Sequence, residues 1–197
     1  MRALPVLIFL CGSVAMAQPV SFGIRGGVPF SGAFSDTSVS EITSYSSSNS
    51  YLVGPMVEVH LPLGFSIEGD GLYHPLNLSQ TTVTGATPAN PSVTIHQRFT
   101  FQSWEFPVLV KYRFLHTPIV KPLVEAGPTF RATGQALSGN FSKAGFVLGG
   151  GVEVKMGHIR VEPELRYIRW GSDSAVSGAN LAPSNVNQAE LTLGLSF

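Results

Sequence analysis

Three residues that could support hydrolysis lie close together in the sequence. His60, Ser66 and Glu68 offer a base, a nucleophile and an orienting carboxylate, which are the three roles of a catalytic triad. Serine and histidine at strand ends more often act as plain hydrogen-bonding groups, and a triad is recognised by its geometry, not by its spacing. The sequence therefore predicts no catalytic residues.

The histidines do not form a metal-binding pattern. His74 and Asp70 lack a third ligand at a suitable spacing, and His96, His116 and His158 fall in or beside predicted connections. A structural or catalytic metal site needs at least three protein ligands that converge. We therefore expect neither a metal nor a cofactor.

Gly149-Gly150-Gly151 follows strand residues but opens no helix, which excludes a phosphate-binding loop of the usual kind. These glycines are expected to ease strand curvature or close packing. Cys11 is the only cysteine. It lies in the expected leader, so disulfides, thiolate catalysis and Cys-ligated metals are not expected in the mature protein.

The amino terminus has the pattern of a secretory signal peptide. Arg2 precedes an apolar stretch from Leu4 to Cys11 that is too short to cross a bilayer, and Ala15 and Ala17 supply the small side chains of a cleavage site. The expected division of the chain is a signal peptide at 1–17 and a single domain at 18–197.

The composition is unusually apolar for an exported protein, with 44% hydrophobic and 12% charged residues. No later run approaches the ~18 apolar residues of a transmembrane helix. A closed β-barrel is the other structure that pairs every backbone group within hydrocarbon. The formal net charge is +0, so nothing favours a nucleic-acid partner, which would require a basic surplus.

Alternation of apolar and polar residues, the signature of barrel strands, recurs along the chain. In Ser103 to Arg113, for example, aromatic and branched residues such as Trp104 and Val108 alternate with Glu105 and Lys111. The pattern predicts eight strands, at Val20–Phe30, Ser50–Leu61, Gly64–His74, Ser103–Arg113, 122–131, 143–155, 159–167 and Gln188–Phe197.

The connections between these segments are alternately long and short. The short turns lie at Pro62-Leu63, 115–120 and Gly157, whereas the long connections, rich in Ser, Thr, Asn, Gly and Pro, are predicted to be mobile loops at 32–49, 79–97, 132–142 and 171–187. This arrangement predicts an all-β protein, an eight-stranded antiparallel up-and-down transmembrane β-barrel with its long loops outside the cell.

Two further features bear on this barrel. Aromatic residues are expected in two girdles, with Phe30, Tyr51, Tyr73, Phe130 and Tyr167 near the long loops and Phe22, Phe65, Tyr112 and Phe197 near the short turns. Prolines cannot donate to a strand ladder, so bulges or rim positions are expected at several of Pro55, Pro107, Pro122, Pro128 and Pro163.

The inward face is predicted to carry nine acidic and eight basic residues. An eight-stranded barrel is just wide enough to be filled by its own side chains, so we expect a paired, hydrogen-bonded plug that stabilises the barrel. The alternative is a narrow gated path for ions or small solutes. The predicted lumen network is Arg25, Glu58, Glu68, Asp70, Glu105, Lys111, Arg113, Glu125, Arg131, Lys143, Glu153, Lys155, Arg160, Glu162, Glu164, Arg166 and Glu190.

Four segments resemble the small outer-membrane β-barrel domain family of porin-like proteins: Trp104 to Phe114, Lys121 to Pro128, Gly149 to Glu153, and Val161 to Tyr167. The resemblance implies a barrel similar in shape to the outer-membrane A and X proteins, located in the outer membrane of a double-membraned bacterium. The terminal Phe197 also resembles the signal by which the barrel-assembly machinery recognises its clients.

Three functions remain open on this sequence. The first, which we predict, is a structural or surface-recognition barrel, a monomer surrounded by outer-membrane lipid, with an unknown surface ligand at its polar loops. The second is a narrow porin-like channel. The third is an outer-membrane enzyme that modifies lipids, and the sequence predicts that the protein is not an enzyme.

Overall fold

The computed structural model describes residues 20–31, 37–40, 43–48, 51–84, 93–115, 117, 119–134, 142–171 and 185–197. The expected signal peptide at 1–17 and most of the connections at 132–142 and 171–187 lie outside these residues. Among the described residues, no helix is both long enough and apolar enough to cross a membrane.

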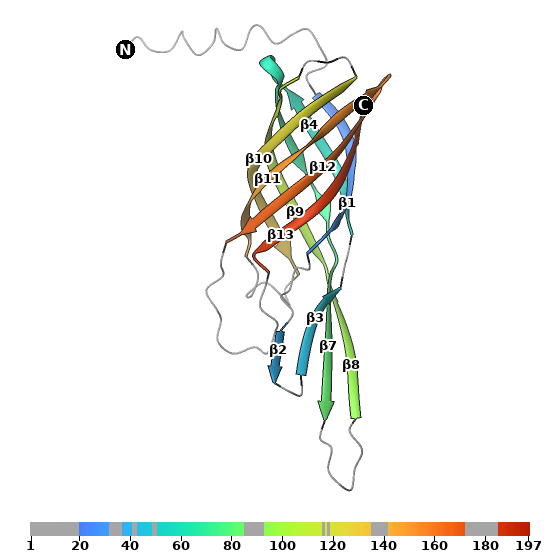
Figure 1. Cartoon of the computed structure of the whole chain (residues 1–197), viewed down its shortest axis with the longest axis vertical. Helices are drawn as coiled ribbons and strands as arrows, with labels where there is room; N and C mark the ends of the chain where they lie inside the picture. Colours follow the sequence, from blue (N-terminus) through green and yellow to red (C-terminus); the bar gives the residue numbers. More distant parts are fainter. Residues whose placement is uncertain are drawn as a thin grey trace, which may run out of the picture.

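Eight antiparallel strands close into a barrel, as the alternation predicts (Figure 1). The strand β1 pairs with β13 on one side and with β4 on the other, which closes the sheet. Gly71 separates β5 from β6, and both pair with β4 and β9, so together they form one barrel strand. The barrel strands are β1 (Val20–Pro29), β4 (Leu52–His60), β5 (Phe65–Asp70) with β6 (Leu72–Tyr73), β9 (Ser103–Arg113), β10 (Val120–Thr133), β11 (Ala144–Met156), β12 (Ile159–Trp170) and β13 (Asn187–Ser196).

The two ends of the barrel differ. One end carries the short 3-10 turn Pro62–Gly64, the β11–β12 turn at Gly157 and the carboxyl terminus; we call it the turn end. The connections of the opposite end, the loop end, are long (Figure 1). This alternation of short and long connections is the one typical of bacterial outer-membrane barrels.

Two of the predicted loops contain strands. The segment 32–49 contains β2 (Thr37–Ser40) and β3 (Thr43–Ser48), and the segment 79–97 contains parts of β7 (Leu76–Thr84) and β8 (Val93–Phe101), which extend beyond it on either side. These strands form a second antiparallel sheet in the order β2-β3-β7-β8 that projects beyond the loop end (Figure 1). The prediction of mobile loops is wrong for the residues in these four strands, because long-range pairing with neighbouring strands stabilises segments whose composition is typical of turns.

Each proline interrupts the pairing with one neighbouring strand but does not shift the register. The expectation of bulges at these prolines is therefore wrong for the barrel strands. Pro55 is not paired with β5 or β6, but the residues on either side of it keep one register: Met56 pairs with Asp70 of β5, and Val53 pairs with Tyr73 of β6. Pro55 pairs with Ile24 of β1 on its other side, and its carbonyl accepts a bond from the Gly71 amide. Successive amides of a strand face opposite neighbours, so a proline removes one bond to one neighbour and leaves the register unchanged.

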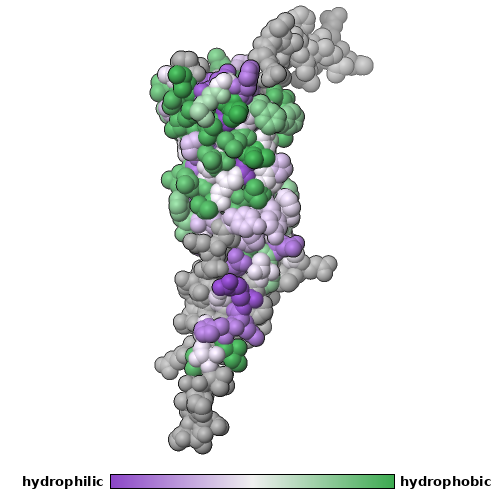
Figure 2. All heavy atoms as spheres, turned by 90° about the vertical axis from the view of Figure 1, so that its right-hand side faces the viewer, coloured by the Kyte–Doolittle hydropathy of each residue, from purple (hydrophilic) through white to green (hydrophobic). Residues whose placement is uncertain are grey.

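The outer wall of the barrel is largely apolar (Figure 2). Two pairs of aromatic rings on this wall lie near its two ends. Near the turn end, the rings of Phe65 and Tyr112 lie 4.7 Å apart on adjacent strands. Near the loop end, the rings of Tyr73 and Trp104 lie 5.5 Å apart. One pair therefore lies toward each end of the barrel, where the two predicted girdles are expected.

Candidate functional site: the charged lumen

Fourteen of the seventeen residues predicted to line the lumen are buried. The other three are basic. Lys143 is exposed because it precedes β11, and Lys155 and Arg160 lie at the turn end, where Lys155 is exposed and Arg160 is half-buried. The buried charges are therefore nine acids against five bases, which corrects the near balance of nine to eight expected from alternation.

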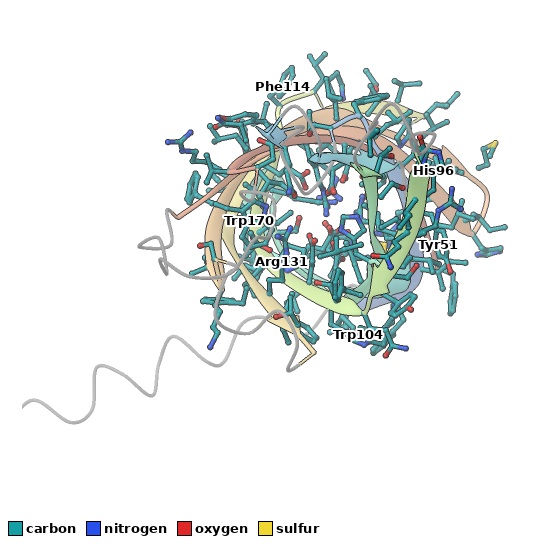
Figure 3. All side chains as sticks on the ribbon, turned by 90° about the horizontal axis from the view of Figure 1, so that it is seen from below. Tyr51, His96, Trp104, Phe114, Arg131 and Trp170 are labelled. Atoms are coloured by element: carbon teal, nitrogen blue, oxygen red, sulfur yellow. The ribbon has the colours of Figure 1, made fainter. Side chains whose placement is uncertain are left out.

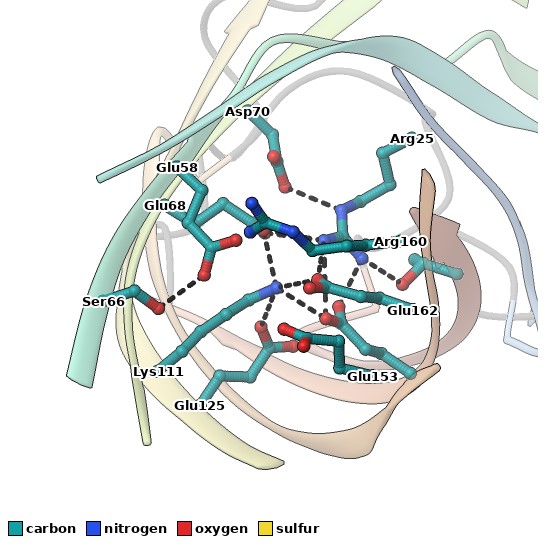
Figure 4. A network of polar contacts seen from close by, with 12 residues as sticks. Arg25, Glu58, Ser66, Glu68, Asp70, Lys111, Glu125, Glu153, Arg160 and Glu162 are labelled. Carbon is teal, nitrogen blue, oxygen red and sulfur yellow. Dashed lines mark hydrogen bonds and ion pairs between the residues drawn. The ribbon is translucent and has the colours of Figure 1, made fainter. Parts of the chain in front are cut away.

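Lys111 lies at the centre of the lumen and is surrounded by carboxylates (Figure 4). Its Nζ lies 2.6 Å from both Glu68 and Glu164 and 2.8 Å from Glu162. The Lys111 side chain is 0% exposed, as are those of these three partners. A buried ammonium group requires this degree of pairing, because its desolvation is costly.

Arg166 and Arg25 extend this cluster toward the loop end. The Arg166 guanidinium donates to Glu125, Glu68 and Asp70 at 2.8, 2.8 and 2.9 Å. Arg25 donates to Glu68 at 2.8 Å and also contacts Glu164 and Asp70. The same carboxylates are shared between cations from different strands, so the network ties β1, β5, β9, β10 and β12 together across the lumen.

Arg113 organises the part of the lumen nearer the turn end. Its guanidinium binds Glu153 at 2.6 Å, Glu58 at 2.7 Å and Glu162 at 3.0 Å. Ser66 accepts a hydrogen bond from Arg113 at 2.8 Å and donates to Glu58 at 2.5 Å. Sequence parity places all of these residues on the inner face, and the structure brings them into contact.

The possible triad of His60, Ser66 and Glu68 is not assembled as a relay. Ser66 is 0% exposed and is engaged by Glu58 and Arg113. His60 lies opposite Ser66 in the β4–β5 ladder but contacts Arg160 and Ser21 through Nε2. Glu68 binds three cations in the central cluster. These contacts position the three side chains as structural groups.

Near the loop end, a smaller polar group surrounds Arg131 (Figure 3). Glu105 accepts bonds from Arg131 at 2.9 Å and from His74 at 2.7 Å. Gln188 and Trp170 complete this group. The predicted lumen network included Arg131 and Glu105 but neither of these two uncharged residues. The alternation of β12 could have predicted the position of Trp170. It lies two alternations beyond Arg166 in the same strand and therefore faces inward as well.

Two groups of carboxylates are close enough to hold a metal ion, Glu58–Glu68–Glu162 and Glu68–Glu125–Glu164. Lysine and arginine already occupy the space between them: Lys111 Nζ lies within 3.8 Å of Glu68, Glu125, Glu162 and Glu164. An ammonium group so placed takes the position that a bound cation would occupy. The arrangement is suited to cross-linking strands through paired charges.

The glycines of β11 leave room for close contact with the adjacent strands β10 and β12. A Cβ atom added to Gly149 would lie 2.4 Å from Glu125 Oε1, and one added to Gly151 would lie 2.3 Å from the Pro163 carbonyl oxygen. The expectation of close packing is thus confirmed for Gly149 and Gly151, whereas the nearest atom to a Cβ at Gly150 would be 3.5 Å away. They leave room for the buried carboxylates that Arg166 binds.

Comparison with known proteins gives a consistent result for the fold. A family model described as outer membrane protein beta-barrel domain matches residues 16–145. OprG, an outer membrane protein from Pseudomonas aeruginosa, aligns with a TM-score of 0.52 at 13% identity, covering 89% of this chain and 94% of that one. Neisserial surface protein A aligns with a TM-score of 0.50 at 12% identity, covering 90% and 94% of the two chains. A search of curated proteins gave no match.

Proposed function

Because the chain belongs to the outer-membrane β-barrel domain family, we propose that it is a non-conducting barrel whose lumen is a stabilising plug and whose function is surface recognition by the sheet beyond the loop end. The central cluster is the observation that supports a non-conducting lumen. Lys111, Arg25 and Arg166 are at most 1% exposed, and each contacts several carboxylates. A conducting lumen would leave such groups in contact with water.

The balance of interactions favours a plug over the narrow channel. An ion entering the lumen would have to displace an ammonium or guanidinium group held by three or four carboxylates. Breaking a buried ion pair costs about 3–5 kcal/mol, so opening by side-chain movement would be rare. A buried apolar cluster of Leu109, Val147, Ile168 and Trp170 occupies further space inside the barrel.

Conductance of the refolded barrel in a planar bilayer tests this proposal, after heat-modifiable gel mobility has confirmed folding. We expect no discrete openings from the wild type or from Glu105→Lys, with a general porin as the positive control. Reproducible openings whose ion selectivity changes on Glu105→Lys would show a pore and overturn the plug.

The sheet formed by β2, β3, β7 and β8 supports the second half of the proposal. It extends the barrel away from the membrane, and the described side chains of β8 are mostly exposed and polar, including Thr94, His96, Arg98 and Thr100. A rigid scaffold that presents polar side chains beyond the loops is the usual setting for recognition. An edge strand such as β8 also offers backbone groups for pairing with a partner.

A hairpin truncation separates recognition from barrel stability. In the β7–β8 register, Leu78 pairs with Phe99 and Ser79 with Arg98, so replacing 79–98 by Asn-Gly should close a two-residue hairpin. We expect a folded barrel that no longer retains cells on immobilised extracellular proteins and glycans. A matched control replaces only His96 and Arg98 by serine. Unchanged retention after truncation would refute the recognition role.

A further inference from the structure

A basic pocket of about 410 Å³ lies at the turn end of the barrel. Four cationic side chains and one carboxylate line it, together with His60. Because Arg113 is also bound by Glu58 and Glu162, the positive surplus of the pocket comes from Lys155 and Arg160. Arg113 and Lys121 both bind the single carboxylate, Glu153, at 2.6 and 3.3 Å. The charged lining residues are Arg113, Lys121, Glu153, Lys155 and Arg160.

Lys155 and Arg160 stand directly opposite each other in the β11–β12 ladder, on the face that lines the pocket. Like charges directly across an antiparallel pair are destabilising. Among the described residues, neither side chain forms an ion pair with a carboxylate, and the Arg160 guanidinium instead contacts His60. This repulsion is relieved when an anion lies between the two cations.

The height of the pocket indicates where that anion comes from. The Phe65–Tyr112 aromatic pair lies at the same end of the barrel, and Phe65 lines the pocket itself. Leu63, in the adjoining turn, is 82% exposed and has a positive φ of 65°. Aromatic residues of barrels mark the level of the lipid headgroups, and an exposed leucine beside them is suited to contact with acyl chains.

We propose that this pocket binds a phosphate group, supplied by the headgroup of an anionic phospholipid of the periplasmic leaflet. Guanidinium and ammonium groups are the usual ligands of phosphate oxygens. The volume of 410 Å³ exceeds the space that an isolated ion needs, since one water occupies about 30 Å³. The remaining space accommodates the glycerol part of a headgroup.

Native mass spectrometry of the folded barrel, titrated with short-chain phosphatidylglycerol, tests this site. We expect saturable binding of one lipid to the wild type and about tenfold weaker binding to Lys155→Gln/Arg160→Gln, as the loss of two charge-assisted contacts implies. Lys143→Gln, which removes an exposed lysine near the loop end, is the matched control and should bind as the wild type does. Lys155→Arg/Arg160→Lys keeps the charges and should also retain binding.

Competition identifies the source of the phosphate. Displacement by glycerol 3-phosphate but not by equal inorganic phosphate supports a headgroup, whereas equal displacement by both assigns the site to free phosphate ions. Equal binding by the wild type and the double glutamine variant, with both folded by heat-modifiable mobility, would overturn the proposal. So would equal binding of zwitterionic phosphatidylcholine.

Discussion

The guanidinium of Arg131 lies over the ring of Trp170 inside the barrel, with its Cζ 3.7 Å from the ring centroid. The two side chains also share one acceptor: Gln188 Oε1 receives bonds from Arg131 Nη2 at 3.0 Å and from Trp170 Nε1 at 2.9 Å. Because Trp170 is 2% exposed, the contact is desolvated, where cation–π attraction is strongest.

Trp170→Phe should destabilise the barrel by about 1–3 kcal/mol, because it leaves Gln188 short of a buried donor and weakens the cation–π contact. Urea unfolding of the refolded protein, followed by gel mobility, measures the change. Trp104→Phe is the control, since Trp104 is 43% exposed on the outer wall; it should change stability by no more than about 0.5 kcal/mol. Equal effects of the two substitutions would rule out a special role for the lumen contact.

Alternation in the sequence was sufficient to predict the eight barrel strands and the fourteen buried charges, because a closed barrel forces successive side chains to opposite faces. It could not predict how the cations pair. The four carboxylates around Lys111 come from β5, β10 and β12, and their convergence depends on strand tilt and stagger. The β7–β8 hairpin was missed for a related reason, since polar segments form strands only when distant partners are in register.

Gly149→Ala should destabilise the barrel by about 1–3 kcal/mol, the usual cost of overpacking a filled interior. The added methyl would lie 2.4 Å from Glu125 Oε1, which must then move away from Arg166 Nε, its partner at 2.8 Å. Gly150→Ala is a closely matched control, because the nearest atom to its Cβ is 3.5 Å away. Chemical unfolding of both variants under identical conditions gives the comparison. If Gly149→Ala were as stable as Gly150→Ala, the close contact between Gly149 and the Glu125 side chain would not be needed for stability.

Arg166→Met should cost about 3–5 kcal/mol, because removing one partner of a buried ion pair leaves uncompensated charge. Four carboxylates contact this guanidinium within 3.0 Å. Lys143→Met removes an equivalent charge from an exposed position and should be within about 0.5 kcal/mol of the wild type. The midpoint and slope of urea unfolding distinguish the two variants. A wild-type midpoint for folded Arg166→Met would mean that the lumen charges do not stabilise the barrel.

A charge placed on the outer wall should be tolerated according to its depth. Val108 lies at the middle of β9, is 44% exposed and pairs with Gly69 of β5, far from both ends of the strand. Arginine at the bilayer midplane of a barrel costs about 2–4 kcal/mol, whereas near an interface it costs only about 0–1 kcal/mol. Val108→Arg should therefore unfold at clearly lower urea concentration than Phe114→Arg, whose side chain follows the last residue of β9 at the turn end. Refolding both variants into lipid vesicles and measuring unfolding tests this order, and the reverse order would place the hydrocarbon at a different height on the barrel.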